Sequence, residues 1–371
     1  MSEKKFRYGN IFTYSSLQFS GNLEEYFAKH AKKLVVFLIM PRLKNKDNLV
    51  RLYKEGKLIK EEKVQLSDNI FLYYFLWLLN YWRIIFSYFS FNEKIISLSF
   101  HPISLFGISL QKMFRHITFV FWIGDYFPPT NLSLTIYQRV KQFYHDRIDY
   151  TCYLGDGINK KMNGRIVDTN KRKTVMWGVK PKHLKRKLSK NNFVILFVGV
   201  VKESQGIEHI FSFLKENNDC FLNIIGICDA ALYKKYKKII KEYKIEKQIF
   251  FPNKFFSDNE LNKLSQKSHV GIAIYDTDPN NPTYYTDPGK VKAYVEMGLP
   301  VIMSDVSAVS EYIKKYHSGE VIAQDTQAVK KAIAKIKKNY HLYEKGVKAM
   351  TDYFYYENYY EKKLKFLEKL K

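Results

Sequence analysis

The stretch FVGVVKESQGI, residues 197–207, decides the fold of this 371-residue chain. It ends an apolar run that begins at Phe193, and such a run predicts a buried strand. Gly199 ends this strand, and Gly206 precedes a predicted helix. Backbone N–H groups in such a loop and at a helix N-terminus form an anion site, to which Lys202 adds positive charge. Glycines also end strands that bind nothing, so the loop by itself leaves a purely structural role open.

A second segment, YYTDPGKVKAYVEMGLPVIMSD at residues 284–305, also leads a polar loop into a helix. Pro288 lies near the first helical turn, a position that favours proline. Lys290 in that turn is disfavoured by the helix dipole unless an anion binds there, and a diphosphate would be such an anion. The alternative is a solvated lysine at an ordinary helix start.

Strands and helices alternate along the whole chain. The pattern predicts strands at 10–15, 33–39, 94–100, 117–123, 150–154, 193–198, 221–225, 248–251, 270–274 and 300–303, and a hairpin at 49–64. It predicts helices at 22–30, 70–91, 132–147, 205–215, 230–243, 258–265 and 288–297, one ending near 115, and more over most of 325–371. This alternation predicts parallel sheets with crossover helices.

The chain length suits two domains. A basic stretch poor in apolar residues at 171–190, which contains Pro181, is the best candidate for a linker. We therefore predict an α/β protein of two Rossmann-like, doubly wound domains that face each other across a cleft. The predicted N-terminal domain covers residues 1–178 and the C-terminal domain 179–345, and a C-terminal helix at 346–371 is expected to pack back on the N-terminal domain.

These segments resemble the donor half of GT-B glycosyltransferases, especially the retaining family 4 and its relatives. The loop from Gly199 to Gly206 is similar to the family's diphosphate loop, and Lys290 to its helix-opening lysine. GLPVIMSD at 298–305 resembles the motif that follows this helix, and Trp177-Gly178-Val179 the segment that closes the first domain. The resemblance covers about residues 174–320. It implies the GT-B fold and transfer of a sugar from a nucleotide diphosphate sugar.

The resemblance also implies a set of residues that bind the donor. They are Gly199, Lys202, Gly206, Gly226, Tyr285, Thr286, Asp287, Gly289 and Lys290. The family's pair of glutamates falls here at Tyr285 and Ala293, so the sequence departs from the family at both positions. Relatives without these glutamates include inverting enzymes, and the stereochemistry stays open. No cofactor is expected besides the donor substrate, and no metal site, because the sequence lacks paired-histidine motifs.

Two residues of the N-terminal half are candidate catalytic groups on the acceptor side. Asp125 follows the predicted strand 117–123, where a carboxylate can accept the proton of an acceptor hydroxyl. Capping of the following turn is the alternative role of Asp125. His101 follows the strand at 94–100 and is a second candidate base, with a structural histidine as the alternative.

Charge and hydrophobicity suggest an anionic partner. Residues 1–190 carry 33 basic and 14 acidic side chains (+19), whereas 191–371 carry 28 and 22 (+6). The aromatic-rich helix at 70–91 has a polar stripe at Asn80, Arg83, Ser87 and Ser90, so it is expected to pack as core or to touch a membrane interface rather than to span a membrane.

The expected location is the cytoplasm, with peripheral contact on the inner face of the cell membrane, because no signal sequence is visible and three cysteines build no disulfide framework. The expected acceptor is a glycan or a lipid-linked molecule of cell-surface polysaccharide or glycolipid synthesis. An inactive GT-B accessory subunit and a nucleotide-sugar epimerase remain alternatives. Nucleic acid is not an expected partner, because no nucleic-acid reading module is recognisable.

Overall fold

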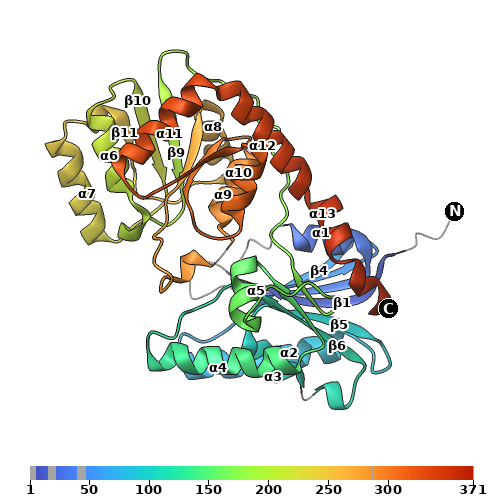
Figure 1. Cartoon of the computed structure of the whole chain (residues 1–371). Coiled ribbons are helices and arrows are strands. Elements are labelled where there is room, and N and C mark those ends of the chain that lie inside the picture. Colours follow the sequence, from blue (N-terminus) through green and yellow to red (C-terminus); the bar gives the residue numbers. More distant parts are fainter. Residues whose placement is uncertain (1–5, 16–21, 40–46, 110, 286, 371) are drawn as a thin grey trace. The chain divides into compact units, whose positions relative to one another are not determined.

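The computed structural model describes residues 6–15, 22–39, 47–109, 111–285 and 287–370 (Figure 1). Two compact units divide the chain. The first consists of Met1–Gly178 and Tyr356–Lys371, and the second of Val179–Tyr355. Each unit has its own sheet, as the alternating pattern predicts.

The first unit contains an eight-stranded sheet. Its strands are β1 (Tyr8–Ser15), β2 (Ala31–Leu38), β3 (Asn48–Lys54), β4 (Lys57–Val64), β5 (Ile95–Ser99), β6 (Ile117–Ile123), β7 (Tyr150–Tyr153) and β8 (Arg172–Thr174). Their order is β4-β3-β2-β1-β5-β6-β7-β8. The predicted hairpin of β3 and β4 is observed, and it adds the antiparallel edge to an otherwise parallel sheet. The strand order reverses between β1 and β5, which is the topological switch point of this sheet.

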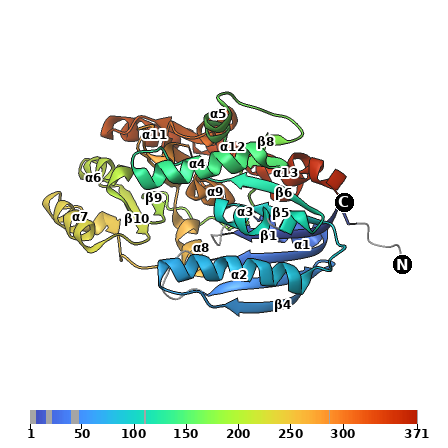
Figure 2. The same cartoon turned by 90° about the horizontal axis from the view of Figure 1, so that it is seen from below.

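Six α-helices and two 3-10 segments belong to the described part of the first unit. They are α1 (Leu23–His30), α2 (Ile70–Tyr88), α3 (Pro102–Ser109) with the 3-10 turn η1 (Gln111–Met113), α4 (Leu132–Arg147), α5 (Asp156–Asn163) and α13 (Tyr356–Lys363), and η5 (Lys365–Leu370) follows at the end. Asn69 caps α2 by accepting from two backbone N–H groups, and Asn131 caps α4 in the same way with one. α3 packs against both α2 and α4, so these three helices form one layer (Figure 2).

The second unit contains a six-stranded parallel sheet. Its strands are β9 (Phe193–Val198), β10 (Cys220–Ile225), β11 (Ile249–Phe250), β12 (Val270–Ala273), β13 (Val301–Ser304) and β14 (Gly319–Ile322). Their order, β11-β10-β9-β12-β13-β14, is that of a Rossmann fold. The chain moves outward in one direction from β9 and in the other from β12. The switch point of this sheet therefore lies between β9 and β12. Ligands of such sheets bind at the carboxyl ends of the two strands that flank the switch point.

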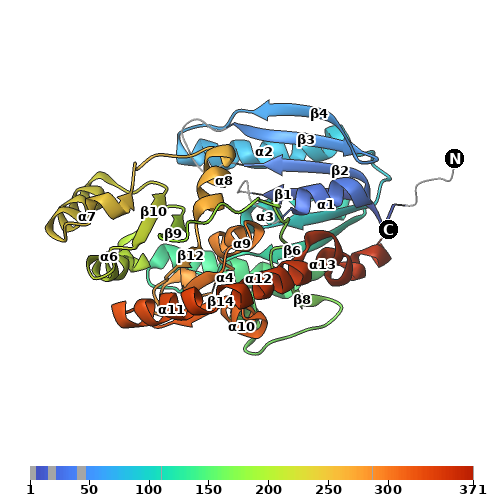
Figure 3. The same cartoon turned by 90° about the horizontal axis from the view of Figure 1, so that it is seen from above.

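Helices cover this second sheet (Figure 3). They are α6 (Ile207–Lys215), α7 (Ala230–Glu242), α8 (Asp258–Lys267), α9 (Gly289–Glu296), α10 (Val309–Tyr316), α11 (Thr326–Lys338) and α12 (Tyr340–Phe354), with short 3-10 turns η2 (Glu203–Gln205), η3 (Glu246–Gln248) and η4 (Pro282–Tyr284). The core lies between the sheet and α6, α7 and α11, where residues such as Phe211, Tyr236 and Ile336 are buried. Burial of this apolar surface is the main stabilising contribution.

The residue at which the chain returns to the first unit differs from the expected one. The expected boundary at 346 falls inside α12, whose Gly346 lies so close to the carbonyls of Tyr316 and His317 that a Cβ would clash with both. The chain returns to the first unit only at Tyr356. There, the hydroxyls of Tyr359 and Tyr360 accept from the backbone N–H groups of Met176 and Gly178.

The charge asymmetry is smaller when it is counted by structural unit. Six of the cations counted with the first half lie between Lys180 and Lys190, which belong to the second unit. The first unit has 32 basic and 17 acidic residues (+15), and the second 29 and 19 (+10). Both units are basic, so the charge difference between the two halves of the sequence is only partly a difference between the two units.

Candidate functional site

The loop after β9 is built on close backbone packing. Gly199 has a φ of 118°, a value that favours glycine. Its carbonyl oxygen would lie 1.9 Å from a Cβ at Gly226, so only a glycine at 226 lets the ends of β9 and β10 approach this closely. Gly206 has a φ of 59° and faces Ile274 and Gln324, where a Cβ would be crowded at 2.9–3.0 Å. The three predicted glycines therefore shape the turn at the switch point.

Lys290 reaches the same turn from the first turn of α9. A Cβ on Gly199 would lie 3.9 Å from the Lys290 Nζ atom, so the amine lies beside that glycine. Nζ is buried, has no hydrogen-bond partner among the described residues, and lies 4.0 Å from the centroid of the Phe197 ring. The ring of Tyr275 is the next aromatic neighbour, at 5.3 Å. The amine thus occupies an aromatic recess at the carboxyl end of β9.

This recess changes the ionisation of Lys290. Burial, and secondarily the charge of nearby Lys202, lower the pKa of Lys290 to about 7. Lys202 itself is exposed in the loop before η2. Two cations therefore face the same loop, an arrangement that an anion would stabilise. The structure brings the predicted Gly199, Lys202, Gly206, Gly226 and Lys290 together.

The residues that precede α9 have other surroundings. Asp287 is buried, and its Oδ2 atom lies 3.8 Å from Nζ of Lys292, which is buried over the ring of Phe354. Burial lowers the pKa of Lys292 to about 8, and the carboxylates of Asp287 and Glu296 oppose that shift. Asp287 therefore belongs to a buried ion pair that supports α9.

The remaining predicted donor residues lie in the same loop. Tyr285 is buried against Tyr284, with ring centroids 5.0 Å apart. Gly289 is the first residue of α9 and lies in open space, with no atom near the position of a Cβ. Thr286 lies outside the described residues.

Tyr294 is a residue of α9 that sequence analysis missed. Its hydroxyl accepts from the backbone N–H of Val198 and donates to the carbonyl of Ile272, both at 2.9 Å. One side chain thus joins β9 and β12 at the switch point. Its ring lies against Gly271, where a Cβ would come within 2.3 Å of it. In the sequence, the only indication of this role is that an aromatic residue follows Lys290 by one helical turn.

The acceptor-side candidates lie at the carboxyl ends of neighbouring strands. His101 follows β5, at the switch point of the first sheet, and Asp125 follows β6, the adjacent strand. The Tyr137 ring lies 5.6 Å from the His101 ring, and Asp125 raises the pKa of Tyr137 as a secondary cause after burial. The structure therefore brings both predicted residues to the same edge. Asp125 is exposed, whereas the ring of His101 also contacts Trp77 at 5.3 Å.

Burial lowers the pKa of His101 to about 4, with a smaller effect from Lys141. Its ring is therefore neutral at pH 7, and its basicity is weak for proton abstraction near neutral pH. Of the two candidate bases, Asp125 is better placed to meet an acceptor, because it is exposed.

Lys141 is a second residue that sequence analysis missed. It is buried on α4, and its amine donates to the backbone carbonyl of Asp125 at 2.6 Å. One turn earlier, Gln138 donates to the carbonyl of Phe127 at 2.6 Å. Burial lowers the pKa of Lys141 to about 8, an effect that Asp125 opposes. α4 therefore fixes the loop that carries Asp125.

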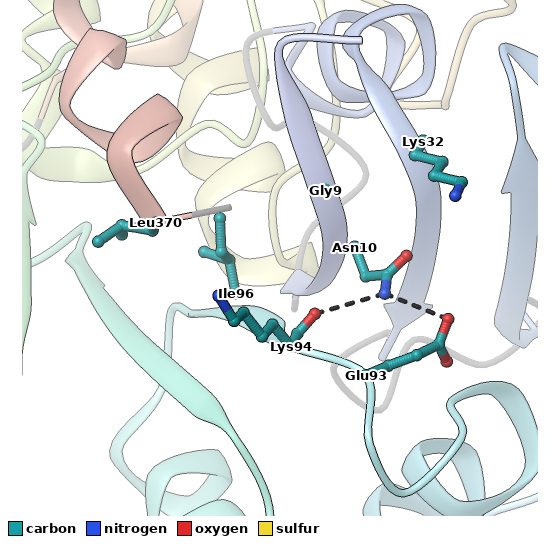
Figure 4. A pocket seen from close by; sticks show the side chains of 7 residues that line it. All are labelled: Gly9, Asn10, Lys32, Glu93, Lys94, Ile96 and Leu370. Carbon is teal, nitrogen blue, oxygen red and sulfur yellow. Dashed lines mark hydrogen bonds between the residues drawn. The ribbon is translucent and has the colours of Figure 1, made fainter.

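A pocket of the first unit lies away from these residues (Figure 4). It lies at the amino ends of the strands, between Gly9 and Asn10 of β1, Lys32 of β2 and Ile96 of β5. Asn10 donates to Glu93 and to the carbonyl of Lys94 there. Because His101 and Asp125 follow the carboxyl ends of their strands, this pocket lies at the opposite edge of the sheet. Across the described ranges, no three His, Cys, Asp or Glu side chains gather as a metal site.

Known structures share this fold. Sucrose-phosphate synthase from Thermosynechococcus elongatus superimposes with a TM-score of 0.70 at 13% identity and covers 97% of this chain and 99% of its own. HepE of Anabaena, in complex with UDP, gives 0.65 at 11% identity with 98% of each chain. WaaG, a glycosyltransferase involved in lipopolysaccharide biosynthesis, gives 0.59 at 11% identity with 97% and 99%. The predicted GT-B fold is confirmed.

The sequence of the second unit carries a family signature as well. Residues 192–339 match the family model described as glycosyl transferases group 1, whereas a search of curated protein sequences finds no match. The matched range includes β9, α9 and Lys290. The predicted resemblance and the prediction of a glycosyltransferase are thereby confirmed. Residues 192–339 are thus similar to the glycosyl transferases group 1 family, within a chain that has the GT-B fold.

Proposed function

We propose that this protein transfers a sugar from a nucleotide diphosphate sugar to a glycan or lipid-linked acceptor, in the synthesis of a cell-surface polysaccharide or glycolipid. The observation that carries the proposal is the amine of Lys290, buried beside Gly199 at the switch point of the second sheet. A buried amine without a hydrogen-bond partner is costly, and a diphosphate would satisfy it. The complex of HepE with UDP and the involvement of WaaG in lipopolysaccharide biosynthesis support the same class of donor and acceptor.

In this proposal the protein acts mainly on the leaving group. As the sugar departs, negative charge grows on the diphosphate, and Lys202, Lys290 and the N–H groups of the loop would stabilise it. Asp125 would accept the proton of the acceptor hydroxyl, or orient that hydroxyl if the donor phosphate takes the proton.

We place this function in the cytoplasm, with peripheral contact on the inner face of the membrane. Among the helices that the structure describes, none is long and apolar enough to cross a membrane. A net charge of +15 on the first unit supports attraction to anionic lipid.

A thermal-shift screen of UDP, GDP and ADP, followed by their sugar conjugates, tests the donor. We expect one nucleotide series to raise the melting temperature, because a ligand at a hundred times its Kd adds about 2.7 kcal/mol to the free energy of unfolding. Incubating that donor with acceptor extracts should then release the nucleoside diphosphate. Binding without release would instead favour an inactive accessory subunit, and conversion of the sugar without an acceptor would favour an epimerase. The absence of any shift and of any release contradicts the proposal.

The pH dependence of UDP affinity tests the role of Lys290. The free protein loses the proton of this amine above about pH 7, while binding to a diphosphate favours the protonated form. UDP affinity should therefore fall between pH 7 and pH 9, by up to about tenfold per pH unit. Isothermal titration calorimetry in two buffers of different ionisation enthalpy would also detect the proton taken up. A flat affinity over this range would contradict the placement of the diphosphate.

A further inference from the structure

Exposed apolar side chains gather on one part of the first unit. Fifteen of the twenty-two large apolar side chains that are exposed in the described part of the chain lie between Phe71 and Phe143. Scattered exposed apolar residues are normal on a soluble protein, but contiguous ones mark an interaction surface. The three helices of this segment, α2, α3 and α4, pack side by side (Figure 2).

α2 carries the longest line of these side chains. Phe71, Phe75, Leu79, Trp82 and Phe86 are exposed, and their spacing of four, four, three and four places them along one face of the helix. Phe71 is 84% exposed and Phe75 57%. Other faces of the same helix are buried in the protein, where Tyr81, Ile84 and Ile85 are fully covered. α2 therefore lies flat on its domain, with apolar residues on both the buried and the exposed side.

α4 repeats this pattern. Leu132, Ile136, Val140 and Phe143 are exposed at a spacing of four, four and three. Along the chain, α3 and η1 lie between α2 and α4, and their residues Phe106 and Met113 are exposed as well. We call the exposed residues of α2, α3, η1 and α4 the apolar face.

The charges around the apolar face are mostly positive. Residues 70–91 contain one charged residue, Arg83. The guanidinium of Arg115 lies 4.7 Å from the Phe86 ring centroid and that of Arg147 3.9 Å from the Phe143 ring centroid. Arg115 is buried and donates to the carbonyl of Phe89, whereas Arg147 is exposed, and an exposed arginine beside an aromatic ring is typical of a membrane interface.

The nearby carboxylates have partners. Asp149 pairs with Lys112 at 2.6 Å, and Asp146 lies 2.8 Å from the imidazole of His145, whose pKa burial lowers below its usual value. The apolar face thus combines aromatic side chains, arginines and few acidic groups. A bilayer with anionic headgroups has the complementary chemistry, with apolar chains below a negative surface.

We propose that the apolar face docks the protein on the surface of an anionic phospholipid membrane, with α2 and α4 lying in the plane of the interface. This inference deepens the proposed function, on which it rests for the lipid-linked acceptor that such docking would bring within reach. A spanning orientation is excluded for the folded domain, because one side of α2 is part of its core. The shape of the apolar face rather than the net charge of the chain carries the inference, since both units are basic.

Flotation with vesicles of phosphatidylcholine and about one-third phosphatidylglycerol tests the docking. The variant Phe71→Glu/Phe75→Glu should reduce the bound fraction by about tenfold or more, since two charges enter the apolar face. The matched control is Phe255→Glu/Leu342→Glu, which changes the net charge equally at residues of the second unit that are 72% and 59% exposed. The control should float like the wild type, and circular dichroism should show both variants folded.

A second measurement identifies the face that meets lipid. Trp82 is 38% exposed, whereas Trp77 and Trp122 are buried. Brominated lipid should quench part of the wild-type fluorescence, and this part should vanish in Trp82→Phe. Quenching that persists in this variant, or equal flotation of the two double variants and the wild type, would overturn the proposal.

A wild-type protein that ignores vesicles would overturn it as well. Light scattering would then assign the apolar face to a second copy of this chain if Phe71→Glu/Phe75→Glu turns a dimer into a monomer. Failure of the docking remains distinguishable from failure of the proposed function, because the UDP thermal shift needs no membrane and the proposed donor site lies in the second unit.

Discussion

Replacing Lys290 with methionine is expected to weaken UDP binding by about 10- to 150-fold, equivalent to about 1.5–3 kcal/mol, the scale of a charge-assisted hydrogen bond. The amine lies at the turn of Gly199, where the switch point predicts the diphosphate. Methionine is unbranched like lysine and only one atom shorter, so the variant removes the charged amine and keeps most of the apolar packing. Isothermal titration calorimetry with UDP measures the loss.

The same variant should make the free protein more stable, and this opposite change separates a ligand contact from a structural one. In the unfolded chain the amine holds its proton up to about pH 10.5, and in the folded protein only up to about pH 7. Between these values the unfolded state binds more protons, so the free energy of unfolding rises with pH, and the cost of burial is fully present below pH 7. At pH 7, Lys290→Met should therefore raise the free energy of unfolding by about 1–3 kcal/mol, the cost of an unsatisfied buried polar group.

Lys263→Met is the matched control, because it removes one charge from an exposed position of α8 in the same unit. It should change neither UDP affinity nor stability by more than about 0.5 kcal/mol. A Lys290→Met protein that is less stable and still binds UDP like the wild type would show that the amine supports the fold and does not meet the donor.

The sequence could predict most of the framework, because strong local signals agree with the tertiary structure. The strand 117–123 and the helix 132–147 match β6 and α4 to the residue, since an unbroken apolar run defines the first and the Asn131 cap begins the second. β8 was missed inside the predicted linker, because its three residues, Arg172–Thr174, are polar and form the edge of the sheet. α5, α10 and β14 are short, and no periodicity separates them from loops.

The candidate site could be predicted only at the level of the backbone. Glycine positions and the start of α9 follow from local sequence, so the approach of Lys290 to Gly199 was foreseeable. The directions of side chains were not, because they depend on packing between distant strands. Asp287 belongs to the predicted donor loop but pairs with Lys292, and Lys141 holds the Asp125 loop from a helix that looks ordinary in sequence. The polar stripe of α2 was recognised, whereas the exposed line of aromatic residues beside it depends on which sides of the helix the domain covers.

Replacing Asp125 with asparagine is expected to lower turnover by about 10²- to 10⁴-fold if the carboxylate is the general base, while UDP binding stays unchanged. Asp125 is exposed at the carboxyl end of β6, and Lys141 fixes its backbone by a 2.6 Å hydrogen bond. Asparagine keeps the shape of the side chain and a hydrogen-bonding oxygen but cannot accept the proton. If the donor phosphate takes the proton instead, Asp125 only orients the acceptor, and the loss should appear mainly as a higher KM for the acceptor.

Steady-state kinetics with the acceptor varied at saturating donor separates these two roles, once circular dichroism and the UDP thermal shift show that Asp125→Asn is folded. Loss of a capping carboxylate alone would cost about 1 kcal/mol of stability and leave turnover near the wild-type value. Asp168→Asn is the control, because it neutralises an exposed carboxylate of the same unit whose nearest cation, Lys173, is 3.9 Å away. Near-wild-type turnover in a folded Asp125→Asn protein would eliminate both roles. His101→Gln would then be the decisive variant, and a base with a pKa of about 4 predicts a rate that stays flat from pH 6 to pH 8.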